Sequence, residues 1–333
     1  MWLECFLWEK GIYMTREHVS DIWNERVKGH SHYDFVDVNI NSDNLLFIDP
    51  VLIEMNQGKW YKDANLIVQS FFDEFYKAYR DNNISRKREL LSHAGEQNAT
   101  RFGYGRGDNG RGNTVNGLLA IFSPLEDYIE RISTIEKAVD LPLLLTRFSQ
   151  DGLSDLLTNI LHNHLNEYML KQMEKFKVKS NGRTKYWTWD LARLSWKEVS
   201  APSYKVNNQE LLIVPKSIVR KNYLFSIEQF FSRVLIERER SAGEYYDNDK
   251  DRFIPKKEVE NIIKNKSDFG IHWKYEESLI YIKDNNDALD EYHRRLHSFY
   301  SKRKGMGDKE LDDLIYKERI MLKKNGNSYC MNI

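Results

Sequence analysis

The sequence predicts an α+β protein, with a mixed core of short strands and long amphipathic helices followed by a mostly helical C-terminal part. Short strand-like runs bounded by turn residues lie mainly before Phe225, and helical spacing of apolar residues dominates after it, apart from a strand or hairpin expected at Ile271–Ile282. The 333 residues are 41% hydrophobic and 30% charged, which is enough apolar material for a folded core. We expect a mixed core domain over residues 1–222 and a mainly helical domain over residues 223–333.

Apolar periodicity assigns the individual elements. The helices that it predicts cover 15–28, Asn65–Arg80, Val115–Ala138 with a break at Pro124, and Ser154–Phe176 with Ser154 as its N-cap. Alternation predicts a strand over Tyr33–Ile40, and the turn cluster that follows it predicts a β-hairpin with a second strand at Leu45–Ile48. A buried strand is expected at Glu210–Val214, ended by Pro215.

Cysteine usage and hydropathy indicate a cytoplasmic protein. Cys5 and Cys330 are the only cysteines, so neither a disulfide framework nor a cysteine-rich zinc site can be built from them. No apolar run reaches the ~18 residues of a membrane span, so we expect no membrane partner.

The formal net charge is zero, but the charges are unevenly spread along the chain. Residues 1–75 carry six basic and thirteen acidic side chains, a net charge of −7, whereas residues 171–221 carry twelve basic and four acidic side chains, a net charge of +8. The second segment is therefore a candidate surface for a polyanion, with a solvated basic face as the alternative.

Four residues form a candidate catalytic magnesium site. Asp49 ends a predicted strand, and Asp155 belongs to a polar stripe with Asn159, His162 and Asn166 on one face of the long helix. Carboxylates on rigid elements are the oxygen ligands that Mg²⁺ prefers, so Asp49 and Asp155 are its candidate ligands and Glu210 a third. Glu210 and Lys216 resemble the acid and lysine of the PD-(D/E)XK nuclease core, although the spacing differs from a strict ExK and Pro215 intervenes. The alternatives are a strand terminator at Asp49 and the solvated side of a helix at Asp155.

Two segments combine cations with features suited to nucleic acid. The candidate contacts in the basic segment are Lys179, Arg183, Lys185, Trp187 and Trp189, where cations would meet phosphates and flat rings would stack on bases. Trp187 and Trp189 alternate, so on a strand they would share one face; the alternative is that they belong to the core. The glycine-rich stretch 101–114 adds Arg106 and Arg111 on a loop that approaches a polyanion closely.

An acidic stretch in the C-terminal part has the spacing of an EF-hand loop. Its candidate Ca²⁺ ligands are Asp247, Asp249, Asp251 and Glu258. Arg252 replaces the turn glycine, and Pro255 stands where a small polar residue usually helps to hold a water. The alternative is an acidic loop followed by a helix that begins near Pro255.

Three stretches, Leu46–Pro50, Leu153–Ile160 and Val214–Val219, resemble an uncharacterised bacterial protein family associated with phage-defence and mobile loci. The resemblance covers roughly residues 35–220 and implies work on nucleic acid, without assigning an activity or a catalytic residue.

The sequence therefore supports two functional hypotheses. The first is a nucleic-acid-acting component of a bacterial defence system, acting as a Mg²⁺-dependent nuclease. The second is a non-enzymatic nucleic-acid-binding or adaptor subunit that also contacts partner proteins of the same system.

Overall fold

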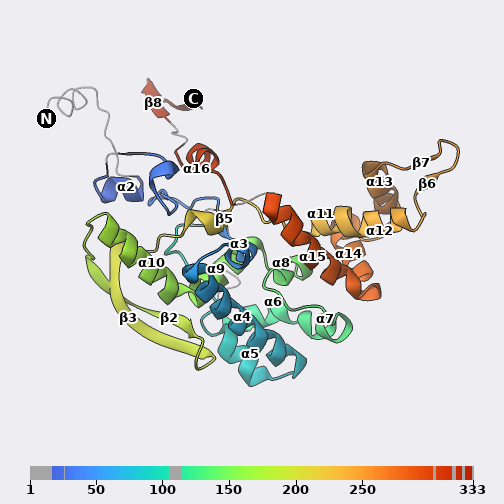
Figure 1. Cartoon of the computed structure of the whole chain (residues 1–333), viewed down its shortest axis with the longest axis horizontal. Coiled ribbons are helices and arrows are strands. Elements are labelled where there is room, and N and C mark those ends of the chain that lie inside the picture. The colour runs from blue at the N-terminus through green and yellow to red at the C-terminus, as the bar shows by residue number, and fades with distance from the viewer. Residues whose placement is uncertain are drawn as a thin grey trace.

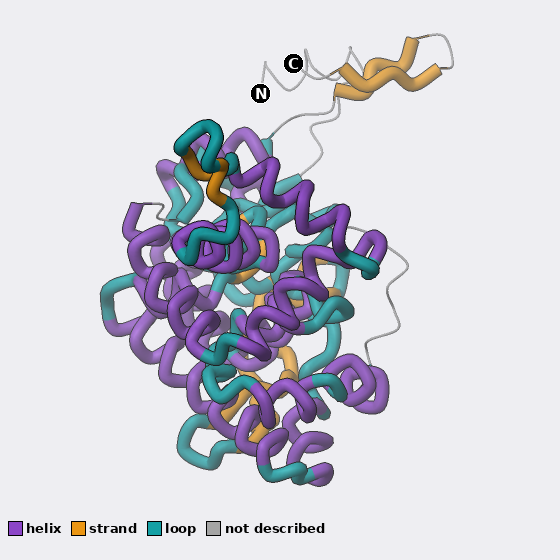
Figure 2. The backbone as a smooth tube through the Cα atoms, turned by 90° about the vertical axis from the view of Figure 1, so that its right-hand side faces the viewer, coloured by secondary structure: helices purple, strands orange, loops and turns teal. Residues whose placement is uncertain are grey.

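The computed structural model describes residues 17–25, 27–104, 114–302, 305–316, 320–324 and 327–331. Most of the chain forms one body, and an arm extends from it on the side opposite the longest β-hairpin (Figure 1). When the molecule is seen from the side on which the arm lies, helices cover the small strands of the body (Figure 2). No helix in these described ranges is both long and apolar enough to cross a membrane. The α+β prediction with a helical C-terminal part is confirmed.

Helices make up most of the body. In chain order they are α2 (Val19–Ile22), α3 (Pro50–Met55), α4 (Lys59–Arg80), α5 (Ile84–Leu91), α6 (Val115–Phe122), α7 (Leu125–Arg131), α8 (Asp140–Leu144), α9 (Gln150–Ile160) and α10 (His162–Lys175), with short 3₁₀ turns η1 (His30–His32) and η2 (Lys216–Ile218). The amphipathic helix expected at Asn65–Arg80 is confirmed as the larger part of α4. The expected break at Pro124 separates α6 from α7.

The strands form small antiparallel sheets. The largest is β2 (Gly182–Asp190), β3 (Ser195–Val206) and β4 (Gln209–Leu211), in that order, and β1 (Phe47–Ile48) pairs with β5 (Val219–Arg220). Thus the hairpin predicted between 33–40 and 45–48 is wrong. Phe35 instead forms a bridge with Pro215, and both early segments pair with the chain after β4 because that apolar stretch offers its backbone on both sides.

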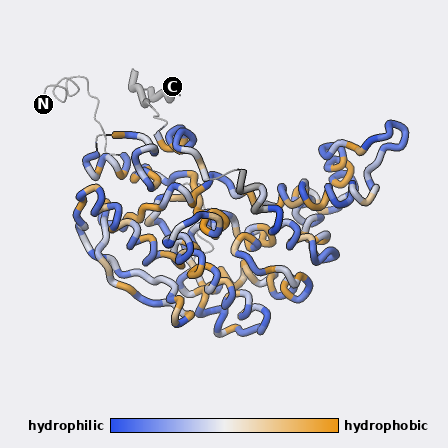
Figure 3. The backbone as a smooth tube through the Cα atoms, in the orientation of Figure 1, coloured by the Kyte–Doolittle hydropathy of each residue, from blue (hydrophilic) through white to orange (hydrophobic). Residues whose placement is uncertain are grey.

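Residues 211–220 run through the centre of the body. Leu211 to Val214 are buried, as are Ile218 and Val219. The backbone groups of this stretch are satisfied from several directions: Leu212 N–H donates to the Ala99 carbonyl, Val36 N–H to Val214, and Asp49 N–H to Ile218. Figure 3 shows the hydrophobic stretches gathered in this middle region.

The long helix predicted over Ser154–Phe176 is two helices, α9 and α10, with a break at Leu161. The helical segment also begins earlier than predicted, at Gln150, so Ser154 is not its N-cap. Ser154 is buried inside α9, and its hydroxyl accepts a hydrogen bond from the backbone N–H of Ile48 in β1 at 3.0 Å. This contact fixes α9 against the central strands.

The C-terminal part forms the arm and then returns to the body. Its helices are α11 (Ile227–Phe230), α12 (Ile236–Ser241), α13 (Lys256–Lys266), α14 (Trp273–Asp284), α15 (Asp287–Lys302) and α16 (Asp308–Ile315), with a π-helical turn η3 (Phe231–Leu235), a 3₁₀ turn η4 (Gly270–His272), and hairpins β6 (Tyr246–Asp247) with β7 (Arg252–Phe253) and β8 (Ile320–Lys324) with β9 (Asn327–Met331). The strand or hairpin predicted at Ile271–Ile282 is wrong, because Trp273, Leu279 and Ile282 are buried at helical spacing in α14.

Helix α16 closes the fold by packing against the N-terminal region. The Tyr316 hydroxyl donates to the fully buried Asp37 carboxylate at 2.7 Å, and the Asp312 carboxylate accepts from both the backbone N–H and Nδ1 of His30. The Asp37 N–H donates to Nε2 of His30, so the neutral imidazole carries its proton on Nδ1. These contacts cross the domain boundary expected at residue 222, and that boundary itself stays a prediction.

We predict that Tyr316→Phe lowers the free energy of unfolding of the whole body. The buried Asp37 carboxylate loses a donor, and a hydrogen bond to a charged group contributes about 1.5–3 kcal/mol. Urea denaturation measures the change. Tyr246→Phe is the matched control, because that hydroxyl donates to Asp251 on an exposed hairpin and its loss should cost less than about 0.5 kcal/mol. Equal stability of the two variants would show that α16 lies outside the cooperative unit.

Candidate nucleic-acid interface

The four residues of the predicted magnesium site each have a different hydrogen-bond or ion-pair partner. Asp49 caps α3 by accepting from the Val51 N–H at 2.9 Å, and its other oxygen pairs with Arg220 at 3.3 Å. Glu210 pairs with His162, and Lys216 donates to Asp308 at 2.6 Å. Asp155 accepts from the backbone N–H of Gln97. Asp155 and Glu210 both adjoin the network of Gln97 and His162. Asp49 and Lys216 have other partners.

Helix geometry explains why Asp49 and Asp155 do not share a site. Ser154 is the residue of α9 that faces β1, next to Asp49. Consecutive residues of an α-helix point about 100° apart, so Asp155 faces the loop at 95–97 instead. In the described part of the chain, no group of three or more His, Cys, Asp or Glu side chains is arranged to hold a metal ion. The magnesium nuclease stays a prediction, and this geometry adds no support to it.

Asp155 is in an unfavourable place for a carboxylate. Burial raises its pKa well above the ordinary value, and the nearby carboxylates of Asp151 and Glu96 raise it further. The pKa of Asp151 is also raised, by burial and then by Asp43 and Glu96. A carboxyl that favours its protonated form is therefore present here, among acidic neighbours that repel a polyanion.

The polar stripe of α9 and α10 forms a buried hydrogen-bond network rather than a solvated face. The Gln97 side chain accepts from the Ala99 N–H, which directs its Nε2 toward Asn159 Oδ1 at 3.2 Å and His162 Nδ1 at 3.4 Å. In the neutral imidazole the proton then lies on Nε2 of His162, which donates to Glu210 at 3.2 Å. His162 also stacks on Tyr186 of β2, with ring centroids 4.0 Å apart. The network thus fixes one side of the β2–β3 hairpin to α10.

The opposite side of the hairpin, which we call the outer face, is open to solvent. Arg183, Lys185 and Trp187 occupy alternate positions of β2, are all exposed, and lie directly opposite Pro202, Ser200 and Glu198 of β3. Arg183 donates to the Ser200 carbonyl at 2.7 Å, and Lys185 lies 3.7 Å from Glu198. Lys179, in the loop before β2, is exposed as well.

Trp187 and Trp189, which were predicted to share one face of a strand, differ in how far they are exposed to solvent. Trp189 is only 4% exposed, because α4 packs over it: its Nε1–H donates to Ser70 Oγ at 3.0 Å and its ring meets Phe71 edge-on. Trp187 is 40% exposed. Both rings reach a common aromatic cluster, Trp189 through Trp196 and Trp187 through His93. Trp189 is therefore a core residue, and Trp187 is the one available to a ligand.

Sequence reasoning missed His93, which follows α5. Its ring lies 4.0 Å from that of Trp187 with an angle of 12° between the planes. The two residues are far apart in the chain, and no local pattern marks a single histidine after a helix as the partner of a tryptophan. Burial lowers the pKa of His93, which favours the neutral imidazole.

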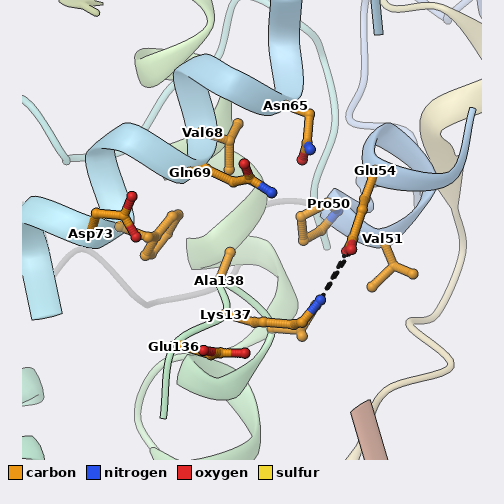
Figure 4. Close-up of a pocket in the computed structure, with 12 residues that line it drawn as sticks. Pro50, Val51, Glu54, Asn65, Val68, Gln69, Asp73, Glu136, Lys137 and Ala138 are labelled. Carbon is orange, nitrogen blue, oxygen red and sulfur yellow. Dashed lines mark hydrogen bonds and ion pairs between the residues drawn. The ribbon is translucent and has the colours of Figure 1, made fainter. Parts of the chain in front are cut away.

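A pocket of about 250 Å³ lies elsewhere, between α3, α4 and residues 136–139. Figure 4 shows the carboxylates of Glu54, Asp73 and Glu136 around it, with the Lys137 ammonium bonded to Glu54 at 3.1 Å. The rim at 136–137 is fixed by the buried Asp140, which accepts from both backbone N–H groups and pairs with His293 of α15 at 2.7 Å. Its three acids and single base disfavour a polyanion, so we exclude this pocket from the interface.

The predicted calcium ligands belong to the β6–β7 hairpin and the helix after it. Asp247 pairs with Lys250 at 2.9 Å, and Asp251 accepts from the Tyr246 hydroxyl. Asp249 lies in the turn, and Glu258 is in the first turn of α13, which begins just after Pro255. Asp247 and Asp251 thus have local partners and Glu258 belongs to a helix, so these side chains are not arranged around a common metal centre. Arg106 and Arg111 of the glycine-rich stretch lie outside the described residues.

We predict that Asp155→Asn makes the free energy of unfolding less sensitive to pH. The folded state raises the pKa of Asp155, so the contribution of its protonation to stability is complete below the ordinary carboxyl pKa and is lost as the pH rises through the raised value. The asparagine keeps an oxygen for the Gln97 N–H and carries no charge. Its advantage over the parent protein should therefore grow as the pH rises above the ordinary carboxyl pKa of about 3.9, as measured by urea denaturation.

The control for this experiment is Asp73→Asn, which changes an exposed carboxyl of α4. The difference between that variant and the parent protein should stay nearly constant over the same range. If Asp155→Asn instead destabilises the protein increasingly toward alkaline pH, the carboxylate is stabilised in the folded state, and Asp155 returns as a ligand candidate.

Comparison with known proteins places the chain in a family without an assigned activity. The family model described as "Domain of unknown function (DUF8370)" matches residues 26–226, which include α9, α10 and the β2–β3 hairpin and leave out the arm. No curated protein and no solved structure matches the chain. The match does not concern phage defence or mobile loci, so that association stays a prediction. Since the match covers more than half of the chain, the protein belongs to this family, the domain of unknown function DUF8370.

Proposed function

We propose that the protein is a non-enzymatic nucleic-acid-binding subunit that contacts its ligand through the outer face of the β2–β3 hairpin. The observation that carries the proposal is the row formed by Arg183, Lys185 and Trp187 on one exposed side of β2. Two cations and an aromatic ring on a rigid strand combine the two kinds of contact that nucleic-acid-binding surfaces use, with phosphates and with bases.

The hairpin is firmly supported from its other side, which favours a preformed binding surface. Thr188 donates to the Ile160 carbonyl at 3.1 Å, and Tyr186 donates to Asn163 at 3.0 Å while it stacks on His162. A side chain on a strand held in this way has less freedom to lose on binding than one on a mobile loop. The net charge of +8 over residues 171–221 attracts a polyanion to the same segment.

Catalysis is not part of this proposal. Asp49 and Lys216 pair with Arg220 and Asp308, and Glu210 accepts a hydrogen bond from His162. The cations of the hairpin are exposed, which favours them over these groups as contacts for a ligand.

We predict that Lys179, Arg183 and Lys185 together set the salt dependence of binding. Fluorescence anisotropy with a labelled oligonucleotide should show affinity that falls as the salt concentration rises, because bound phosphates release counterions. The triple alanine variant should bind more weakly and reduce the slope of log K against log salt by about 2, at roughly 0.7 for each lost contact with a single strand.

The matched control removes three exposed cations elsewhere, by Lys59→Ala, Lys250→Ala and Arg294→Ala. It should leave the slope nearly unchanged. Loss of plasmid in the presence of Mg²⁺, prevented by EDTA, would contradict the non-enzymatic proposal. Equal slopes for the two triple variants would place any nucleic-acid contact away from the hairpin.

A further inference from the structure

The aromatic pair on the outer face has a defined geometry that limits what it can bind. His93 and Trp187 are nearly parallel, and Trp196 meets His93 edge-on at 5.6 Å and 74°. Trp196 is itself fixed, because its Nε1–H donates to the Leu90 carbonyl in α5 at 2.9 Å. Trp196 therefore supports the His93 ring, which in turn packs against one side of the Trp187 indole.

Trp187 is contacted by one aromatic ring and is partly exposed to solvent. Among the described residues, His93 is the only aromatic ring in contact with Trp187, and 40% of the Trp187 surface is exposed. Lys185 precedes Trp187 on the same face by about 6.8 Å along the strand, and Arg183 precedes Lys185 by the same interval. The face thus offers one flat ring followed by two evenly spaced cations.

We infer that the outer face binds single-stranded nucleic acid, with one unpaired base stacked on the open side of Trp187 and the adjoining phosphates at Lys185 and Arg183. In this arrangement His93 is a positioning residue, which holds the indole at the angle that the base requires. The inference rests on the proposed function and specifies the substrate class of the same site.

Base stacking explains why a single strand fits this face better than a duplex. In a duplex both faces of each internal base are covered by its neighbours, so a ring on an exposed sheet cannot stack on it unless the helix is opened. A single strand presents its bases without that cost, and stacking tolerates any base because each has a π-face. The few cations of the outer face, one of them beside Glu198, give only a limited phosphate contribution, so stacking decides between the two forms.

The test compares a labelled single strand with a blunt duplex of the same length at low salt. The parent protein should bind the single strand at least about tenfold more tightly. Trp187→Ala should weaken single-strand binding by about tenfold and leave duplex binding nearly unchanged, so that the preference disappears. Lys185→Ala should weaken both by a similar factor, because it removes a phosphate contact. A 2-aminopurine base in the strand should be quenched by the parent protein and not by Trp187→Ala.

The positioning role of His93 is tested by removing its ring and then restoring a ring of similar size. His93→Ala should reduce the single-strand preference, and His93→Phe should restore it, because a flat ring of similar size again supports the indole. Thermal melts must show that each variant is folded. If the alanine variant is unfolded, it is replaced by Trp187→Leu, which keeps a large apolar side chain but has no flat ring for a base to stack on. A merely structural role of His93 would lower affinity for both ligands together and leave their ratio unchanged.

Two failures are distinguishable. If the protein binds single strand and duplex equally and Trp187→Ala changes neither affinity, the stacking inference is overturned while the proposed function stands. If it binds neither ligand even at low salt, the proposed function fails, and the inference fails with it.

Discussion

The backbone of residues 211–220 is the constraint on which the rest of the structure depends. This stretch is apolar and passes through the middle of the body, where each N–H and carbonyl that meets no water needs a partner. Those partners come from widely separated parts of the chain, among them Val36, Asp49 and Ala99. The segments that contain Val36 and Asp49 therefore pair with the buried stretch and not with each other. The β2–β3–β4 sheet leads directly into it, which joins the outer hairpin to the core.

Buried side-chain carboxylates need polar partners for the same reason as the buried backbone groups. Each deeply buried carboxylate has a specific partner: Asp37 accepts from Tyr316, Asp49 pairs with Arg220, and Asp140 pairs with His293. Removing one partner from such a pair is costly because it leaves an uncompensated charge in a medium of low polarity. Of the acids predicted to be catalytic, Asp49 joins α3 to β5 in this way. Asp37 and Asp140 join the C-terminal part of the chain to the body.

The two sides of the β2–β3 hairpin differ: one side is packed against the body, and the other is exposed to solvent. On one side, polar and aromatic contacts with α10 hold the strand in place, and on the other Lys185 and Trp187 face solvent. A strand makes this division possible because successive side chains point to opposite sides of the sheet.

Local periodicity and charge were enough to predict the α+β class, the helix at α4, the break at Pro124 and the basic character of the hairpin segment. The sequence also indicated that Trp187 and Trp189 share a face, since alternation on a strand requires it. Tertiary structure decided which of the two is exposed, because α4 covers only Trp189. It likewise placed His93 against Trp187 and paired β1 with β5, contacts between residues far apart in the chain that no local pattern encodes.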